Sequence, residues 1–115
     1  SHEDLVDSFE VETLLWINVG PSYEGDCLIL LQDKENYGCL IFGYGSCGGC
    51  DELEGSYGNL EELTTLRNRY WDSIEWKSRA EMCEYFLSDD AQLQWWGHAA
   101  EFKSFKAQVL EVLKN

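Results

Sequence analysis

Two neighbouring apolar segments constrain the fold of this chain more than any other feature of its sequence. The segments, DCLILLQD (26–33) and YGCLIFGYG (37–45), are joined by the polar turn Lys34-Glu35-Asn36, a pattern that predicts a β-hairpin. Successive side chains of a strand point to opposite faces of the sheet. In the first segment both faces are therefore apolar, with Leu28 and Leu30 on one and Cys27, Ile29 and Leu31 on the other. Such a hairpin needs helices or another layer on each face, which predicts an α+β sandwich.

The sequence on either side of this hairpin supplies further elements. VETLLWINV (11–19) can alternate as a third strand, although its start could instead continue a short helix from Asp4. After the glycine-rich loop the apolar period becomes helical. Asn59 followed by Glu62 resembles a capping box, and we expect a helix from about residue 60 to 71.

The last third of the chain predicts one short strand and two more helices. SIEW (73–76) is the strand candidate, and Ser78 with Glu81 forms a second capping box. The helix after this box has an expected apolar stripe of Ala80, Cys83, Phe86 and Leu87. The final helix, from about 99 to 114, offers Phe102, Phe105, Val109 and Val112 to the core. We therefore predict a single domain over residues 1–115, in which a small antiparallel β-sheet packs with about three α-helices.

Negative charge is concentrated in the first part of the chain. Residues 1–66 carry fourteen Asp or Glu against the single Lys34, whereas residues 67–115 carry eight acids and seven bases, and the whole chain has a net charge of −14. Such a field repels nucleic acid phosphates and anionic membranes and attracts basic proteins, but it also serves simple solubility. The acids expected to contact a basic partner are Glu10, Glu12, Glu24, Asp26, Asp33, Glu52 and Glu54.

The sequence contains no apolar run near the length of about 18 residues that would span a membrane, and no signal peptide with a basic start. We therefore expect a soluble protein of the cytoplasm. The five cysteines are an odd number, which argues against a complete disulfide framework and favours reduced thiols or a metal site.

The strongest chemical motif lies in the glycine-rich stretch GYGSCGGCDELEG (43–55). Cys47 and Cys50 have the C-x-x-C spacing that lets two thiolates converge on one tetrahedral metal ion. Gly48 and Gly49 have no Cβ and can adopt a positive φ, so a tight turn between the cysteines is sterically allowed. A second C-x-x-C is absent, so any further ligands must come from elsewhere in the chain.

The expected metal is zinc, and four residues are candidates to complete its coordination. His98 is the best third ligand by chemistry, because imidazole and thiolates are ordinary zinc ligands; a surface or satisfied core histidine is the alternative. Asp51 could supply a carboxylate oxygen or only cap the turn. Cys39 and Cys83 sit among apolar residues, as does Cys27, so we expect core packing for all three, with Cys39 as a reserve ligand.

A redox dithiol and a plain glycine loop are the alternatives to a metal knuckle. A redox C-x-x-C usually begins a helix whose dipole lowers the thiol pKa. Here a hairpin precedes the motif, and Asp51, Glu52 and Glu54 would raise the thiol pKa. We therefore favour the metal. No other catalytic constellation is convincing, since the chain has neither a phosphate-binding glycine loop nor a nucleophile elbow with triad partners, and we expect no enzyme activity.

NYGCLIFGYGSCGGCDELEG, with the following LEELTTLRNRYWDSIEW, resembles a group of small proteins encoded by bacteriophages and prophages, in which a G-S-C-x-G-C-D element closes a hairpin before a helix. The resemblance covers about residues 25 to 77. Its motif residues are Gly45, Ser46, Cys47, Gly49, Cys50 and Asp51. It implies a phage accessory protein, of which anti-CRISPR proteins and anti-restriction DNA mimics are examples among small acidic proteins.

Three functions are consistent with these features. The first is a non-enzymatic inhibitor that docks its acidic part on the basic, nucleic-acid-binding groove of a host defence nuclease, such as a CRISPR effector, without binding nucleic acid itself. The second is a small thiol redox or metal-handling protein that acts through Cys47 and Cys50. The third is a structural module of a phage particle or host complex. We favour the inhibitor, with the C-x-x-C loop as a structural zinc knuckle.

Overall fold

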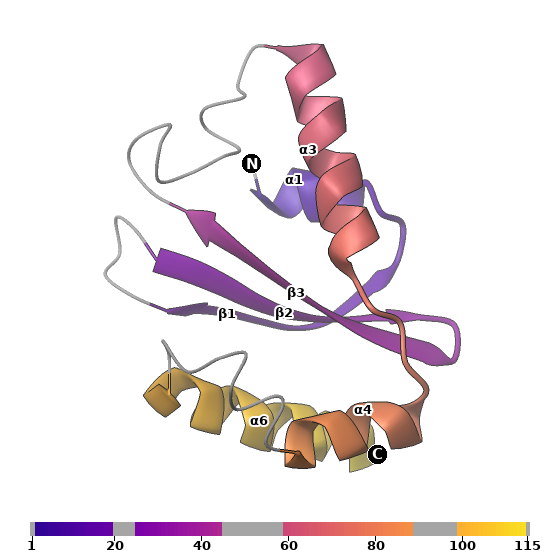
Figure 1. Ribbon diagram of the computed structural model, residues 1–115, viewed down its shortest axis with the longest axis vertical. Coiled ribbons are helices and arrows are strands. Elements are labelled where there is room, and N and C mark those ends of the chain that lie inside the picture. Colours follow the sequence, from indigo (N-terminus) through magenta and orange to yellow (C-terminus); the bar gives the residue numbers. More distant parts are fainter. Residues whose placement is uncertain (1, 20–24, 45–58, 89–98, 115) are drawn as a thin grey trace.

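The computed structural model describes residues 2–19, 25–44, 59–88 and 99–114. Their central feature is a three-stranded antiparallel sheet in the order β1-β2-β3. Two helices cover each face of the sheet: α1 and α3 lie on one side, and α4 and α6 on the other (Figure 1). The predicted α+β class is confirmed. No helix in these ranges is both long and apolar enough to cross a membrane.

The sheet is a meander built around the predicted hairpin. β2 (Gly25–Asp33) is the central strand and pairs along its whole length with β3 (Asn36–Tyr44). The turn between them includes Lys34, whose φ of 58° is the left-handed conformation that tight turns require. β1 (Glu12–Val19) pairs with the other side of β2, which confirms the third strand.

A β-bulge near the start of β1 reverses which face its side chains occupy. Thr13 pairs with Leu31 and Leu15 pairs with Leu30, so Leu14 is an extra residue in β1. An extra residue breaks the two-residue alternation of a strand, so Leu14 and Leu15 both pack on the face of the sheet that α4 and α6 cover. The bulge therefore allows two consecutive leucines of β1 to pack on the same face of the sheet.

The first core layer lies between the sheet and the helices α1 (His2–Asp7) and α3 (Leu60–Ser73). Phe42 of β3 stacks on Tyr70 of α3, with their ring centroids 5.3 Å apart. α1 is held to α3 by Arg67, whose guanidinium lies 5.1 Å from the centroid of the Phe9 ring and donates to the Ser8 carbonyl oxygen at 3.0 Å. The short N-terminal helix is thus a packed part of the fold, ending at Asp7 before the strand begins.

The second core layer joins the opposite face of the sheet to α4 (Arg79–Leu87) and α6 (Ala99–Lys114). Leu28 and Leu30 point into it, whereas Ile29 and Leu31 point into the first layer, and all four are fully buried. This arrangement confirms the prediction that both faces of the hairpin are covered.

The expected helix boundaries are close to those observed, and both predicted capping residues act as N-caps. The Asn59 side chain accepts from the backbone N–H of Glu62 at 3.0 Å at the start of α3. At the start of α4, Ser78 and Glu81 form the complete reciprocal capping box. Each cap satisfies backbone donors that the first turn of a helix leaves unpaired.

The predicted apolar stripe of α4 is wrong at two positions. Ala80 is exposed and Leu87 is 66% exposed, whereas Met82 and Phe86 are the buried residues. In α6 the expected Phe102, Phe105 and Val109 are buried, and Leu113 takes the place of Val112 as the most buried residue of the last turn. α4 and α6 pack on each other and on the sheet, and these contacts, which the spacing of apolar residues does not contain, decide which side of each helix is buried.

The predicted strand at 73–76 is also wrong. α3 extends to Ser73, and the segment after it forms only an isolated bridge between Lys77 and Tyr37, with backbone N···O distances of 2.7 and 2.8 Å. Ile74 and Trp76 instead pack across Gly38, where an added Cβ would lie 2.3 Å from Ile74 Cγ2. Only glycine permits this approach, so apolar packing replaces a regular strand here.

Candidate functional site

The four predicted metal ligands lie outside the described residues: Cys47, Cys50, Asp51 and His98. The zinc site therefore remains a prediction from the sequence. Within the ranges that the structure does cover, no group of three or more His, Cys, Asp or Glu side chains is arranged to hold a metal ion.

The three remaining cysteines are free thiols that pack in the core. Cys27 is buried in the first core layer, and its Sγ lies 3.0 Å from Asn18 Oδ1. Cys39 and Cys83 are half-buried against the second layer. Burial raises the pKa of the Cys39 thiol to about 12, against a smaller opposing effect of the nearby Lys77 ammonium. A thiol that resists ionisation is a poor metal ligand, so this environment supports packing for Cys39.

The predicted partner-binding acids are divided between two ends of the sheet. Glu12 pairs with Gln32 at the end where β2 turns into β3, so Glu12 lies near Asp33, and Glu10 precedes Glu12 by two residues at the same end of β1. Asp26 lies at the opposite end of β2, about 23 Å away for seven residues of strand. Glu24, Glu52 and Glu54 fall outside the described residues. Glu10, Glu12 and Asp33, which we call the acidic end, form no ion pair with any residue of the described ranges.

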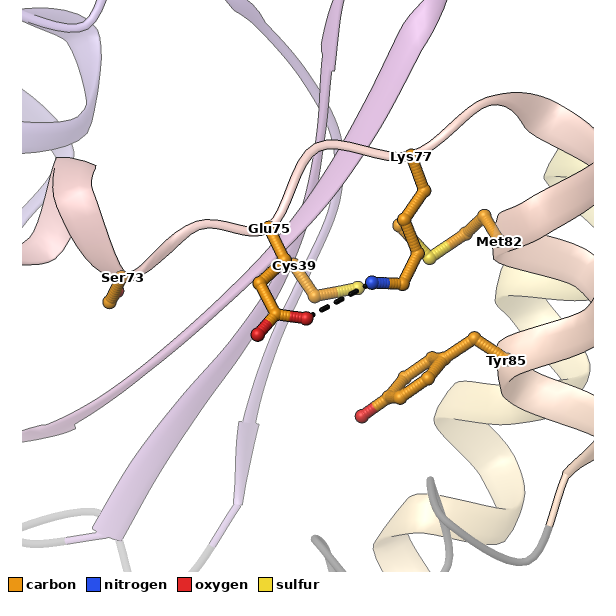
Figure 2. A pocket seen from close by; sticks show the side chains of 6 residues that line it. All are labelled: Cys39, Ser73, Glu75, Lys77, Met82 and Tyr85. Atoms are coloured by element: carbon orange, nitrogen blue, oxygen red, sulfur yellow. Dashed lines mark hydrogen bonds and ion pairs between the residues drawn. The ribbon is translucent and has the colours of Figure 1, made fainter.

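A small pocket opens between the edge of β3 and α4 (Figure 2). It encloses about 100 Å³ and is lined by Cys39, Ser73, Glu75, Lys77, Met82 and Tyr85. Lys77 Nζ lies 3.1 Å from Glu75 Oε2 and 5.2 Å from the centroid of the Tyr85 ring. The Lys77 side chain is 22% exposed and that of Glu75 is 85% exposed, so the pair is open to water on the carboxylate side.

The chemistry of this pocket does not suit nucleophilic catalysis. Its thiol, Cys39, has a pKa of about 12 and is protonated at neutral pH. Its ammonium, Lys77, is already paired with a carboxylate and lies over an aromatic ring. An exposed ion pair of this kind contributes little to stability, because water screens it and two long side chains must be ordered. We interpret the group as a local contact that joins the 74–78 segment to α4.

The outer edge of β1 is the other exposed feature of the sheet. Among the described residues, no strand pairs with β1 on the side away from β2. Glu12, Thr13 and Asn18 are exposed, and Leu14, Leu15, Trp16 and Ile17 are half-buried. The backbone groups on such an edge are potential partners for another extended chain.

Sequence reasoning identified neither this open edge nor the pocket. Both depend on the spatial order of the strands and on where the segment after α3 runs, which local periodicity does not contain. The one available signal was the lack of Lys and Pro in 12–19, since edge strands often carry such protective residues.

Comparisons with known proteins give no relatives. No protein-family model, curated protein or solved structure matches the chain.

Proposed function

We propose that this protein is a non-enzymatic, acidic protein-binding inhibitor that docks on a basic, nucleic-acid-binding surface of a bacterial defence nuclease, as anti-CRISPR proteins do. The observation that carries the proposal is the acidic end of the sheet. Glu10 and Glu12 are exposed, Asp33 is half-buried beside them, and these carboxylates come from two strands and the α1–β1 connection. This end of the sheet thus presents three carboxylates beside the single Lys34, and a groove evolved for phosphates would attract this excess of negative charge.

The distribution of basic residues also supports docking through the acidic end. Seven of the eight Lys and Arg residues follow residue 66, and the α4–α6 layer carries four of them: Arg79, Lys103, Lys106 and Lys114. α1 has acids in its first turn and no base in its last. The protein is therefore expected to approach a basic partner with the acidic end forward and the α4–α6 layer away from it. Its place of action would be the host cytoplasm.

Binding to the partner and its salt dependence test the proposal. Proteins captured from a bacterial lysate at low salt are identified by mass spectrometry, and the affinity of the captured nuclease is then measured with purified protein. The triple variant Glu10→Gln, Glu12→Gln, Asp33→Asn should weaken binding by about tenfold or more, because several rim charges of modest individual effect are removed together. Affinity of the unaltered protein should fall steeply between low and physiological salt.

A matched control removes three charges from another surface. Glu61, Glu62 and Asp72 are exposed on α3, so replacing them with Gln, Gln and Asn gives the same net charge as the test variant. We expect this control to bind within about threefold of the unaltered protein. Equal losses in both variants would mean that only net charge matters, and binding that ignores salt would contradict electrostatic docking.

A further inference from the structure

The two edges of the sheet differ in how they are protected. On the β3 side, the backbone of Lys77 exchanges two hydrogen bonds with Tyr37, and Ile74 and Trp76 pack close to Gly38. On the β1 side, the described residues provide no such cover. Within the described residues, the β3 edge is therefore covered near its start and the β1 edge is uncovered.

The available edge is regular after the bulge. From Leu15 to Val19 every residue of β1 pairs in antiparallel register with β2, from Leu30 to Asp26. Alternate residues of a paired edge strand direct their N–H and C=O groups away from the sheet. β1 contains no Lys or Pro, which are common devices against edge pairing, and its bulge affects only residues 13–15. Five residues give a straight edge of about 17 Å.

Side chains beside this edge are held in place before any partner arrives. Trp16 Nε1 donates to Asn18 Oδ1 at 3.0 Å, and its ring meets Phe42 edge to face with centroids 5.9 Å apart. The same Asn18 oxygen lies 3.0 Å from Cys27 Sγ. On the other face Leu15 and Ile17 are half-buried against the second core layer. An added strand would find ordered apolar surface on both faces, which lowers the entropic cost of binding.

The negative charge near the β1 edge favours a basic segment over a second copy of this chain as the added strand. Glu12 begins β1 and Glu10 precedes it, and both are exposed. A second copy of this chain would bring another net charge of −14 to the interface, so self-pairing is opposed by repulsion. A segment with lysine or arginine would instead gain attraction from the same carboxylates.

We propose that the outer edge of β1, residues Leu15–Val19, binds an extended basic segment of the partner protein by antiparallel or parallel strand addition. Main-chain hydrogen bonds supply the affinity, the half-buried Trp16 and Ile17 contact alternate side chains, and Glu10 and Glu12 attract the bases. This inference rests on the proposed function, because it assumes a basic protein partner, and it specifies how that partner is held.

The test uses a synthetic nine-residue peptide of alternating lysine and valine and two versions of it that are N-methylated on alternate residues, one on the odd and one on the even positions. N-methylation removes backbone donors without altering charge. An added strand pairs through only one of its edges, so one methylated peptide should bind about tenfold or more weaker than the parent, while the other stays within about threefold. Calorimetry at low salt measures the three affinities.

Amide hydrogen exchange locates the bound peptide. Protection should increase at residues 15–19 of β1 and remain unchanged at residues 40–43 of β3, the matched control edge. Equal affinity of both methylated peptides, no binding of the parent peptide at millimolar concentration, or protection on β3 would overturn the inference. Sedimentation that shows a dimer formed through β1 would overturn it in favour of a second copy. If the peptide fails but the nuclease is still bound through the acidic end, the proposed function stands and only strand addition is lost.

Discussion

Cys39 illustrates how the surroundings of a residue decide its chemistry. Its position on β3 places the thiol beneath the 74–78 segment and beside α4, where Met82 is buried. Loss of hydration disfavours the thiolate and raises the Cys39 pKa to about 12, and the positive Lys77 offsets only part of that effect. The residue that sequence spacing suggested as a reserve metal ligand thus behaves as a small apolar core residue.

The raised pKa of Cys39 predicts a specific loss of stability in alkali. The unfolded chain ionises this thiol near pH 9, whereas the folded protein keeps it protonated to about pH 12. The stabilising contribution is therefore complete below pH 9 and is lost as the pH rises from 9 to 12. Between pH 8 and 10, the unaltered protein should lose about 1 kcal/mol more free energy of unfolding than Cys39→Ala, measured by urea denaturation.

Cys39→Ala also removes a side chain, so only the change with pH is compared between the two proteins. Groups that titrate in both proteins cancel in this difference. The matched control is Cys83→Ala, which removes a half-buried thiol from α4. Parallel stability curves for the unaltered protein and Cys39→Ala across this range would show that Cys39 does not stay protonated in the folded state.

At the scale of single elements, α4 depends on its cap more than its length suggests. The helix has nine residues, too few to be stable alone, and its N-terminus is closed by the reciprocal bonds between Ser78 and Glu81. The Ser78 backbone N–H donates to Glu81 Oε1 at 2.9 Å, and the Ser78 hydroxyl accepts from the Glu81 backbone N–H at 3.2 Å. The hydrogen bond from the Ser78 backbone, followed by that from its side chain, lowers the Glu81 pKa.

Removing this cap should destabilise the whole domain. Ser78→Ala is expected to reduce the free energy of unfolding by about 1 kcal/mol, the usual effect of losing an N-cap side chain. Because the Glu81 pKa is depressed on folding, its contribution is present above its ordinary value of 4.5 and is lost as the pH falls below it. Glu81→Ala should therefore flatten the acid side of the stability profile. Glu84→Ala, on the exposed side of the same helix, is the control, and an equal flattening there would contradict a role for the box.

Elements with a strong local signal were predictable, and those decided by distant contacts were not. The hairpin followed from apolar residues on both faces of 26–33, and the starts of α3 and α4 followed from Asn59 and Ser78. SIEW alternates like a strand, but Ile74 and Trp76 pack over Gly38 and leave only one bridge at Lys77. The sequence showed which residues are acidic, but it did not show which of them lie together. The register of β1 against β2 places Asp26 at the end of the sheet opposite to the acidic end.

At the scale of the whole molecule, the uneven distribution of acids and bases along the sequence places them in different layers of the fold. The chain forms α1, the sheet and α3 before it forms the α4–α6 layer. The described acids of residues 1–66 therefore lie on the sheet and on its α1–α3 side, whereas four of the seven bases after residue 66 lie in the α4–α6 layer, and the acidic end adjoins the outer β1 edge. The function proposed above requires this separation, since a partner that is attracted by carboxylates would be repelled by the bases of α6.

The predicted zinc knuckle would connect two parts of this architecture. Its cysteines follow β3, which ends at Tyr44, and His98 immediately precedes α6, which starts at Ala99. Figure 1 shows the end of β3 and the start of α6 on the same side of the molecule. Ordering a stretch that contains Gly45, Gly48 and Gly49 is entropically costly, and a metal that joins it to the last helix would offset that cost.

We therefore expect purified, untagged protein to contain close to one zinc ion per chain, held by Cys47 and Cys50 with His98 and Asp51 as further ligands. Thiolate ligands must be deprotonated, so acid should release the ion, and a chelator should lower the melting temperature because the metal contributes to folding. Cys47→Ser and His98→Ala should lose zinc, whereas Cys83→Ser, which alters a cysteine packed against the core, should retain it. Elemental analysis and thermal melting measure these effects. Less than about 0.2 zinc per chain, together with a melting temperature that the chelator leaves unchanged, would show that Cys47 and Cys50 are thiols of an ordinary glycine loop.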